Sequence, residues 1–422
     1  MTVLRSPMLC MLQSNSNYSH YNKLKTEIVA LLPKCSSSRA GRHSRVGAAW
    51  SLTEVTTFRG QLGRCSRKEH ARQVYKGLPR ASADSQPRAG SVSTGCSPAD
   101  VVEGCWSVVI PTYNRLPILN KCLQALEGQR LSAEHGLSEY EVVVVDDGST
   151  DGTVEALSGV EGAMPFSKVK LFKQQHAGAT EARNLGIRKA KGSVIVFIDS
   201  DMVVTDTFLS SHAKALHESR RNAEDDSAFS YGRVVNTANF EEPTSEPFKL
   251  TDYSAAFFAT GNVAIPRSRL LNCGISLEHG GPFDALFSEY GWEDLELGER
   301  LRQRGARIVQ CPQAVGFHYH PAFTLEQLPA RLDQEAQRGR NAVKFFRLHP
   351  NLNVRLMCQL TWFHQGLWQL LTLFGLVNEH SLRPVLKYLV AHGKAEVAEA
   401  LLSPVYNSHY MRAMEQELQK RG

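Results

Sequence analysis

The sequence predicts an α/β protein with a central sheet and helices on both faces, and two observations support that prediction. Its 422 residues are 42% hydrophobic and 21% charged, which supplies enough apolar side chains for a large core and excludes a disordered or collagen-like chain. Beyond residue 105, short apolar runs alternate with amphipathic stretches. That alternation is typical of strands connected by crossover helices, and it predicts that these strands run parallel.

The first hundred residues differ from the rest in composition. Residues 1–98 contain fifteen Lys and Arg but four Asp and Glu, whereas the whole chain carries a net charge of +6, so the remainder is acidic overall. We therefore expect no nucleic-acid partner, because the basic excess is absent from the part that folds. Residues 1–100 show no sustained helical or strand periodicity, and we expect them to form a disordered basic tail.

The tail is rich in Arg and Ser and poor in acids, and it lacks the apolar run of a secretory signal. This composition is typical of an organelle transit peptide, and we expect import into the chloroplast, with the mitochondrion or the cytoplasm as alternatives. An untargeted extension or a misassigned start codon would give the same composition. The nine cysteines include no Cys-x-x-Cys pair, which argues against a zinc knuckle or a disulfide framework.

The predicted strands are four apolar runs, at residues 106–110, 141–145, 168–172 and 194–198. The amphipathic stretches expected to form helices lie at residues 115–126, 151–158 and 177–190. Ligands bind to sheets of this type at the carboxyl ends of the strands, so the residues after each run are candidates for chemistry. Three runs are followed by polar motifs: PTYNR at 111–115, DDGS at 146–149 and DSD at 199–201.

Asp199 and Asp201 follow the fourth run, with one residue between the two carboxylates. Carboxylates at this spacing can hold Mg²⁺ or Mn²⁺ and leave positions open for phosphate oxygens. A solvated turn also explains an Asp-x-Asp triplet, but carboxylates at the end of a buried strand are costly unless a cation compensates them. His318 and His320 lie on one face of a later predicted strand, and they are either ordinary strand residues or candidates for a third ligand.

Asp146 and Asp147 end the second run. The residues after them supply a turn and a helix cap, but capping does not explain the two carboxylates themselves. A carboxylate there can accept a hydrogen bond from a uracil imide or a sugar hydroxyl, so Asp146 and Asp147 are candidate nucleotide-binding residues. Arg183, in a helix opened by small residues, is a candidate partner for a diphosphate, although it could equally be a surface arginine.

Glu293 and Asp294 follow Trp292 at the start of a predicted amphipathic helix at 292–301. Acids in a first turn favour the helix dipole, which is a sufficient structural reason for both of them. A carboxylate presented in a cleft is also suited to general-base catalysis if burial raises its pKa towards neutrality.

Residues 324–422 are expected to form a helical extension. The stretch at 325–347 is amphipathic, and the stretch at 357–377 contains no Asp, Glu, Lys or Arg. Six polar side chains in the second stretch argue against a membrane-spanning helix. Packing on the folded domain and a peripheral contact with a membrane surface are the remaining alternatives.

Taken in order, these motifs resemble those of the family 2 glycosyltransferases. The similarity covers residues 106–320 and also includes GxxxARNxG at 178–186, TGN at 260–262 and WEDLE at 292–296. The resemblance implies the GT-A fold, a Rossmann-like mixed sheet with helices on both faces, over residues 104–323. It also implies metal-dependent transfer of a sugar from a nucleotide-diphosphate donor, foremost a UDP-sugar, to an acceptor hydroxyl of unknown identity, with Mn²⁺ or Mg²⁺ as the cofactor.

The resemblance also implies a role for each motif residue. The donor would be bound by Pro111, Tyr113, Asn114, Arg115, Asp146, Asp147, Arg183, Asp199 and Ser200. Asp201 would bind the cation directly, and Asp199 would face the ribose and a metal-bound water. Asp294 would be the base that removes the proton of the acceptor hydroxyl, with Glu293 as its catalytic neighbour. Gly261, Asn262 and Trp292 would line the acceptor pocket.

Residues 291–320 resemble in addition the catalytic motifs of galactosyltransferase-like proteins and polypeptide N-acetylgalactosaminyltransferases. The interval of 25 residues from Glu293 to His318 matches the metal-ligand histidine of the latter group, so we expect His318 rather than His320 to bind the ion. Those retaining enzymes carry Glu-Asn where this chain carries Glu-Asp, and the resemblance therefore implies an inverting reaction. A sugar nucleotidyltransferase and a non-catalytic nucleotide or glycan binder are the alternatives.

Overall fold

The computed structural model describes residues 101–420, apart from the segments 159–165 and 224–226 and the positions 250, 251, 253, 255, 278 and 279. The transit peptide predicted at 1–100 lies outside the described residues.

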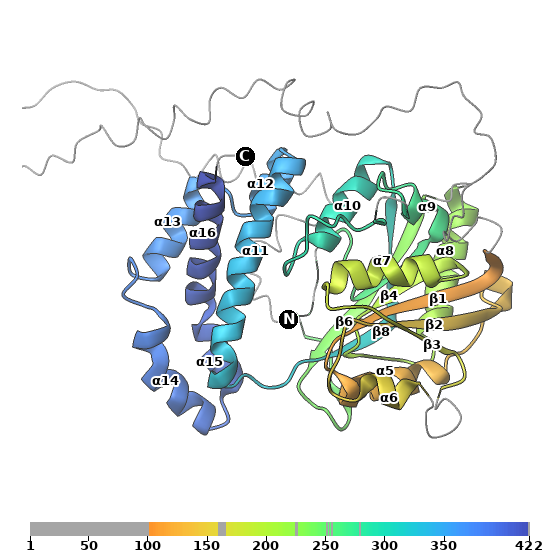
Figure 1. Cartoon of the computed structure of the whole chain (residues 1–422), viewed down its shortest axis with the longest axis horizontal. Helices are drawn as coiled ribbons and strands as arrows, with labels where there is room; N and C mark the ends of the chain where they lie inside the picture. Colours follow the sequence, from red (N-terminus) through yellow and green to blue (C-terminus); the bar gives the residue numbers. More distant parts are fainter. Residues whose placement is uncertain are drawn as a thin grey trace, which may run out of the picture. The chain divides into compact units, whose positions relative to one another are not determined.

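The described strands form one sheet in the order β3-β2-β1-β4-β7-β6-β8-β5 (Figure 1). Their bounds are β1 Val102–Thr112, β2 Glu139–Asp146, β3 Val169–Lys173, β4 Gly192–Ile198, β5 Met202–Val204, β6 Ala228–Thr237, β7 Asn262–Pro266 and β8 Arg307–Tyr319. Strands β1 to β4 pair in parallel as predicted, whereas β7 runs antiparallel to β4 and β6, and β5 runs antiparallel to β8. The α/β fold class with a mixed sheet is therefore confirmed.

Helices cover both faces of this sheet. One face carries α5 (Leu116–Glu127), α6 (Thr153–Leu157) and α8 (Phe208–Ala223), and the other carries α7 (Ala179–Lys189), α9 (Arg267–Leu271) and α10 (Glu293–Gln303). Val108 and Ile110 of β1 join the first core and Val109 joins the second, because successive side chains of a strand point to opposite faces. A strand buried on both faces needs apolar residues at consecutive positions, which explains the continuous apolar runs in the sequence.

The C-terminal extension is helical, as predicted. It consists of the 3₁₀ turn η6 (Leu325–Gln327) and the helices α11 (Leu328–Leu348), α12 (Leu352–Met357), α13 (Trp362–Leu371), α14 (Glu379–Ala391), α15 (Ala395–Leu401) and α16 (Ser403–Gln419). Helix α11 lies beside α16 (Figure 1). Gly339 permits this close approach, because a Cβ at that position would lie 2.3 Å from the carbonyl oxygen of Tyr410.

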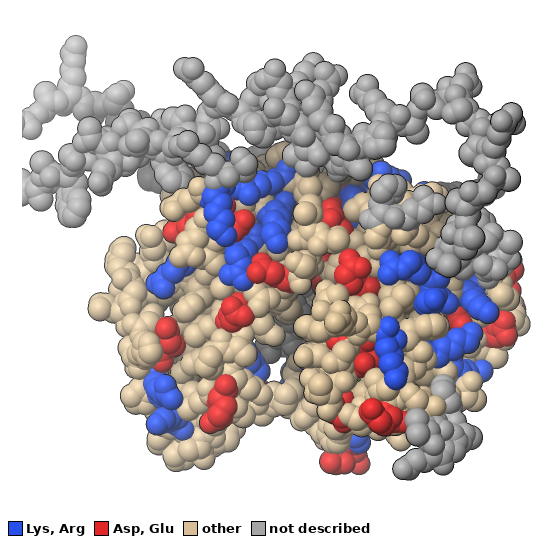
Figure 2. Space-filling model, viewed as in Figure 1, with Lys and Arg blue, Asp and Glu red and all other residues tan. Residues whose placement is uncertain are grey.

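Large apolar side chains are exposed on α13 and on the loop that follows it. We call this set the apolar patch: Trp362, Phe363, Leu370, Leu371, Leu373, Phe374 and Leu376. Trp362 is 81% exposed and Phe374 is 80% exposed. Residues 356–378 contain no Asp, Glu, Lys or Arg, and the edge of the molecule over α13 is largely tan in Figure 2. Over the described residues, no helix has both the length and the hydropathy to cross a bilayer.

Candidate active site

The carboxyl ends of β2, β1 and β4 lie side by side, because these strands are neighbours in the sheet. Thr112 at the end of β1 is in register with Asp146 at the end of β2. The two following loops are tied together, since Asn114 N donates to Ser149 Oγ (2.9 Å) and Asn114 Oδ1 accepts from Thr150 N (2.7 Å). This topology brings together the motifs that follow the first, second and fourth apolar runs.

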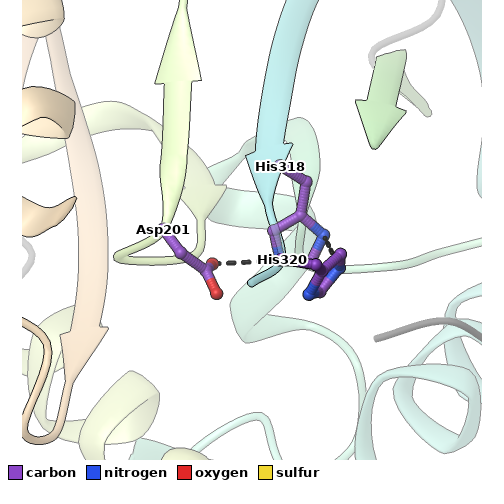
Figure 3. A group of neighbouring side chains, drawn as sticks. All are labelled: Asp201, His318 and His320. Carbon is purple, nitrogen blue, oxygen red and sulfur yellow. Dashed lines mark hydrogen bonds and ion pairs between the residues drawn. The ribbon is translucent and has the colours of Figure 1, made fainter. Parts of the chain in front are cut away.

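Asp201, His318 and His320 form a group of three potential metal ligands whose ligand atoms all lie within 4.8 Å of one another. Figure 3 shows the carboxylate and the two imidazoles meeting where β5 begins and β8 ends. The antiparallel pairing of β5 with β8 sets this arrangement, and Tyr319 N donates to Asp201 O (2.9 Å). His318 Nε2 lies 3.0 Å from Asp201 Oδ1, and His320 Nε2 lies 3.1 Å from His318 Nδ1.

The buried carboxylate of Asp201 has a second basic partner, because Arg115 Nη1 forms an ion pair with Asp201 Oδ2. Burial by itself raises the pKa of Asp201, but the charge and hydrogen bond of His318, together with the charge of Arg115, lower this pKa to about 2. The carboxylate is therefore ionised at neutral pH, in the form that a cation needs.

Asp199 faces a different partner from Asp201. Its Oδ1 accepts a hydrogen bond from Arg183 Nη2 (2.9 Å), and Arg183 Nη1 donates to Glu293 Oε1 (3.2 Å). Arg183 is buried, with its guanidinium above the ring of Phe283. Within the described part of the chain, the buried atoms Arg183 Nε and Glu293 Oε2 have no hydrogen-bond partner. The linked side chains of Asp199, Arg183 and Glu293 therefore form a trio that could make further hydrogen bonds to a ligand.

Asp294 lies in the first turn of α10, next to that trio. Its Oδ1 accepts a hydrogen bond from Leu295 N (2.7 Å). Burial and the neighbouring charge of Glu293 raise the pKa of Asp294 to about 7, against the opposing charge of Arg183. A carboxyl group that titrates near neutrality can accept a proton and release it again at physiological pH, as a general base must.

The Asp147 carboxylate binds the loop that leads into α7. It accepts hydrogen bonds from Gln174 Nε2 (2.7 Å), Ala177 N (2.8 Å) and Gly178 N (2.9 Å). Gly178 has a φ of 91°, a conformation that glycine adopts without strain. Asp147 therefore shapes the loop at the end of β3, and that loop leads to Arg183.

The remaining predicted donor residues surround this loop. Tyr113 is 43% exposed and stacks on His176, with 4.3 Å between the ring centroids. Asp146 is buried and accepts a hydrogen bond from Ser149 N (3.2 Å). Pro111 is half-buried within β1, and Ser200 is buried between the two aspartates of the DSD motif. Only the Tyr113–His176 pair among these presents an open aromatic surface to solvent.

The predicted acceptor residues lie in three different surroundings. Gly261 adjoins the site, because a Cβ there would lie 3.6 Å from Asp199 Oδ2. The Asn262 side chain is fully buried, and it donates to the carbonyl oxygens of Arg233 and Ala314. Asn262 thus connects β6, β7 and β8 in the core of the sheet, instead of presenting its amide to the acceptor pocket that the resemblance implied.

Trp292, also predicted to line the acceptor pocket, contacts the helical extension. Its indole Nε1 donates to Arg338 O (2.8 Å), and its ring lies 5.7 Å from that of Phe345, both residues of α11. The side chain therefore belongs to the contact between α10 and α11. The sequence motifs did not indicate that contact, because Trp292 and Arg338 lie 46 residues apart along the chain.

His320 and His176 also lie at the site. His320 was a candidate ligand that the resemblance ranked below His318, and His176 was not predicted. His320 shares a strand face with His318, and that alternation was a sequence signal for both histidines. His176 follows β3 without any carboxylate or glycine-rich motif to mark it. Its position beside Tyr113 follows from the parallel pairing of β2 with β3.

Known proteins with similar sequences are glycosyltransferases. The chain is 28% identical over 303 residues to validoxylamine A glucosyltransferase of Streptomyces hygroscopicus subsp. jinggangensis, which covers 66% of this chain and 67% of that protein. It is 28% identical over 259 residues to chondroitin synthase of Escherichia coli, which covers 52% of this chain and 35% of the synthase. The chain thus spans about two thirds of the first relative and about a third of the second.

A solved structure with a similar arrangement is a mannosyltransferase from Pyrobaculum calidifontis in complex with GDP-Man and Mn²⁺. It has a TM-score of 0.47 and 19% sequence identity, and the alignment covers 76% of this chain and 88% of that one. Residues 107–273 match the family model described as glycosyl transferase family 2, a segment that runs from β1 to α9 and ends before Asp294 and His318. Residues 107–273 are therefore similar to the family 2 glycosyltransferases.

Proposed function

We propose that this chain transfers a sugar from a nucleoside diphosphate donor to an acceptor hydroxyl, with the aid of a divalent cation. The group formed by Asp201, His318 and His320 is the single observation that supports this proposal most. It lies at the carboxyl edge of the sheet, where α/β proteins bind their ligands.

The ligand chemistry of this group fits a divalent cation. Asp201 offers an ionised carboxylate, and the two histidines offer imidazole nitrogens within reach of it. Imidazole is a poorer ligand for Mg²⁺ than for the first-row transition metals, so this set favours Mn²⁺ over Mg²⁺. Asp201 and His318 would hold the ion, His320 is a third candidate, and Asp199 would lie close by. A bound cation would neutralise the charge that develops on the departing nucleoside diphosphate.

The donor and the stereochemistry are parts of the same proposal. Arg183, held by Asp199 and Glu293, provides a buried cationic group suited to a diphosphate. The exposed Tyr113–His176 pair provides an aromatic surface suited to a nucleobase, foremost the uracil of a UDP-sugar. A single base, Asp294, suffices for direct displacement, and we therefore propose that the anomeric configuration is inverted.

A donor screen tests the metal-dependent part of this proposal. We expect the full chain to bind a nucleoside diphosphate and to release it from one class of nucleotide sugar in Mn²⁺, and to lose both properties in chelator. Asp201→Ala should weaken metal-dependent nucleotide binding by about tenfold or more, because the ion loses its only fully ionised ligand in the group. Asp206→Ala is the matched control, since this acid pairs with Arg130 at the surface. Metal-independent binding, or full binding by Asp201→Ala, would contradict the proposal.

Two further proposals concern where the enzyme acts. We propose that residues 1–100 direct the protein to the chloroplast, on the basis of their composition, and the mature N-terminus of the protein from its own cells tests this. We also propose that the apolar patch rests on a membrane surface. Its exposed Trp and Phe side chains are of the kind that partition into the interfacial region of a bilayer.

A further inference from the structure

The backbone immediately before the proposed base is held in an unusual conformation. Gly291 has a φ of 90°, and Trp292, the N-cap residue of α10, has a φ of 77°. Glycine adopts this left-handed region freely, but for a bulky residue such as Trp292 it is uncommon and costs free energy. Such a conformation persists only when surrounding contacts enforce it. The next two residues along the chain are Glu293 and Asp294.

The contacts that enforce this turn come from α11. Asn341 is fully buried, and its Nδ2 donates to the carbonyl oxygens of Glu289 (2.9 Å) and Gly291 (3.1 Å). Gln337 Oε1 accepts from Tyr290 N (3.0 Å). Every residue from 289 to 291 therefore has a backbone group bonded to one face of α11.

Two more contacts complete this set. Trp292 Nε1 donates to Arg338 O (2.8 Å), and Arg340 forms a bidentate pair with the Glu289 carboxylate. Trp292, the N-cap residue of α10, makes no side-chain capping hydrogen bond, so these contacts from α11 are what hold the backbone just before the helix. A Cβ at Gly291 would lie 3.0 Å from Arg338 Cγ, which shows how closely α11 approaches the turn.

We propose that α11 positions the base: Asn341 and the Arg338 carbonyl hold the left-handed turn at Gly291 and Trp292, and this turn fixes where the Asp294 carboxylate lies. Asn341 is thus a positioning residue, because it acts through the backbone and does not touch the reacting atoms. The inference rests on the proposed function, in which Asp294 is the base. It gives the helical extension a part in the reaction that the family motifs do not record.

Two substitutions test this inference. Trp292→Phe keeps the ring against Phe345 but removes the donor to Arg338, and Asn341→Asp keeps the shape but removes the donor to the two carbonyls. Displacement of a reacting group by about 1 Å costs about a hundredfold in rate, so we expect kcat to fall about ten- to a hundredfold. The affinity for Mn²⁺ should change less than about twofold, because the metal group lies where β5 begins and β8 ends and makes no use of the turn.

Tyr410→Phe is the matched control. It removes a buried hydrogen bond from the Tyr410 hydroxyl to Cys358 O (2.8 Å) in the same helical bundle, but it leaves the turn at 291–292 untouched. We expect it to lower stability while kcat stays within about twofold of the wild type. A general loss of stability in the bundle therefore cannot reproduce the expected pattern.

Hydrogen exchange provides a second readout that does not depend on turnover. Amides of residues 289–297 should exchange faster in Trp292→Phe than in Tyr410→Phe, and Trp292→Phe remains informative if Asn341→Asp fails to fold. Wild-type kcat together with unchanged exchange in Trp292→Phe would overturn the inference. An active Asp294→Asn would instead overturn the proposed base, whatever the α11 variants do, so the two failures are distinguishable.

Discussion

Asp294 is the residue whose charge we expect to control the rate of transfer. Its pKa of about 7 means that the carboxyl is protonated below neutrality and ionised above it. Since a general base acts in its ionised form, kcat should rise with pH and reach half its maximum near pH 7. We expect Asp294→Asn to lower kcat by about a thousandfold while nucleotide binding stays nearly unchanged, because only the transition state needs the base. A kcat that does not vary with pH, or full turnover by Asp294→Asn, would show that another group acts as the base.

The candidate residues of the site could be predicted from the sequence, but the contacts between their side chains could not. The DSD motif and the alternating histidines marked Asp201, His318 and His320 as candidates. Which of them meet depends on the pairing of β5, a strand of three residues, with β8. Asp199 and Asp201 lie two residues apart, yet one bonds to Arg183 and the other to His318. That difference is set by side-chain direction, which spacing along the chain does not determine.

At the scale of elements, a buried polar network connects α8 to the sheet. Asn262 Nδ2 donates to two carbonyls, so its Oδ1 accepts from His212 Nε2 (2.9 Å), and His212 Nδ1 then accepts from the hydroxyl of Ser230 (2.6 Å). Burial lowers the pKa of His212 from 6.5 to about 4, against the opposing effect of its hydrogen bond to Asn262 Oδ1. The imidazole is therefore neutral in the folded protein at pH 7.

This network predicts how stability depends on pH. The unfolded chain binds a proton at His212 near pH 6.5 and the folded chain binds it near pH 4, so its contribution is complete above pH 6.5 and is lost as the pH falls towards 4. The loss amounts to about 3 kcal/mol in the free energy of unfolding. Urea unfolding at several pH values measures it, and His212→Gln should be less stable at pH 7.5 but show a smaller loss on acidification. An equal loss in the variant would assign the effect to other groups.

The same network explains why strands β6 and β7 were not predicted from the sequence. Strands β1 to β4 each contain a mainly apolar segment and were predicted, with bounds close to those observed. Strand β6 places Ser230 and Gly232 in the core, and β7 begins with Asn262. A Cβ at Gly232 would lie 2.2 Å from Asn262 Oδ1, so the glycine leaves room for the amide. Polar and small residues at these positions interrupt the hydrophobic pattern of a strand. In the folded protein the buried side chains of Ser230 and Asn262 nevertheless have hydrogen-bond partners.

At the scale of the whole molecule, the helical extension has two distinct surfaces. The α11 surface is polar and complementary to the segment 289–292, whereas the apolar patch on α13 and the following loop is exposed among the described residues. The sequence stretch at 357–377 predicted neither outcome. Its lack of charge is compatible with a core helix as well as with an interfacial one. The fully buried Cys358 follows α12, whereas α13 contains no buried residue.

The apolar patch predicts binding to an anionic membrane surface. Arg383 and Lys387 are exposed on α14, the helix that follows the patch along the chain, and cations close in sequence to exposed apolar side chains are typical of segments that lie in a bilayer interface. We expect the full chain to sediment with vesicles of phosphatidylglycerol and phosphatidylcholine, and to bind less to phosphatidylcholine alone. Phe374→Ser combined with Leu376→Ser should weaken this binding about tenfold or more, because each buried apolar side chain contributes about 1.5–3 kcal/mol.

Leu131→Ser is the matched control for that experiment, since Leu131 is 49% exposed on the catalytic domain and lies outside the patch. It should leave vesicle binding unchanged.

Light scattering without lipid tests the competing explanation, in which a second copy of the chain covers the patch. Self-association that disappears in the Phe374→Ser and Leu376→Ser variant would support that explanation and contradict the membrane proposal. Equal sedimentation of the wild type and this variant with anionic vesicles would also contradict the membrane proposal. Loss of membrane binding with unchanged kcat on a soluble acceptor would separate this surface from the catalytic site, because the patch lies on α13 and the proposed base on α10.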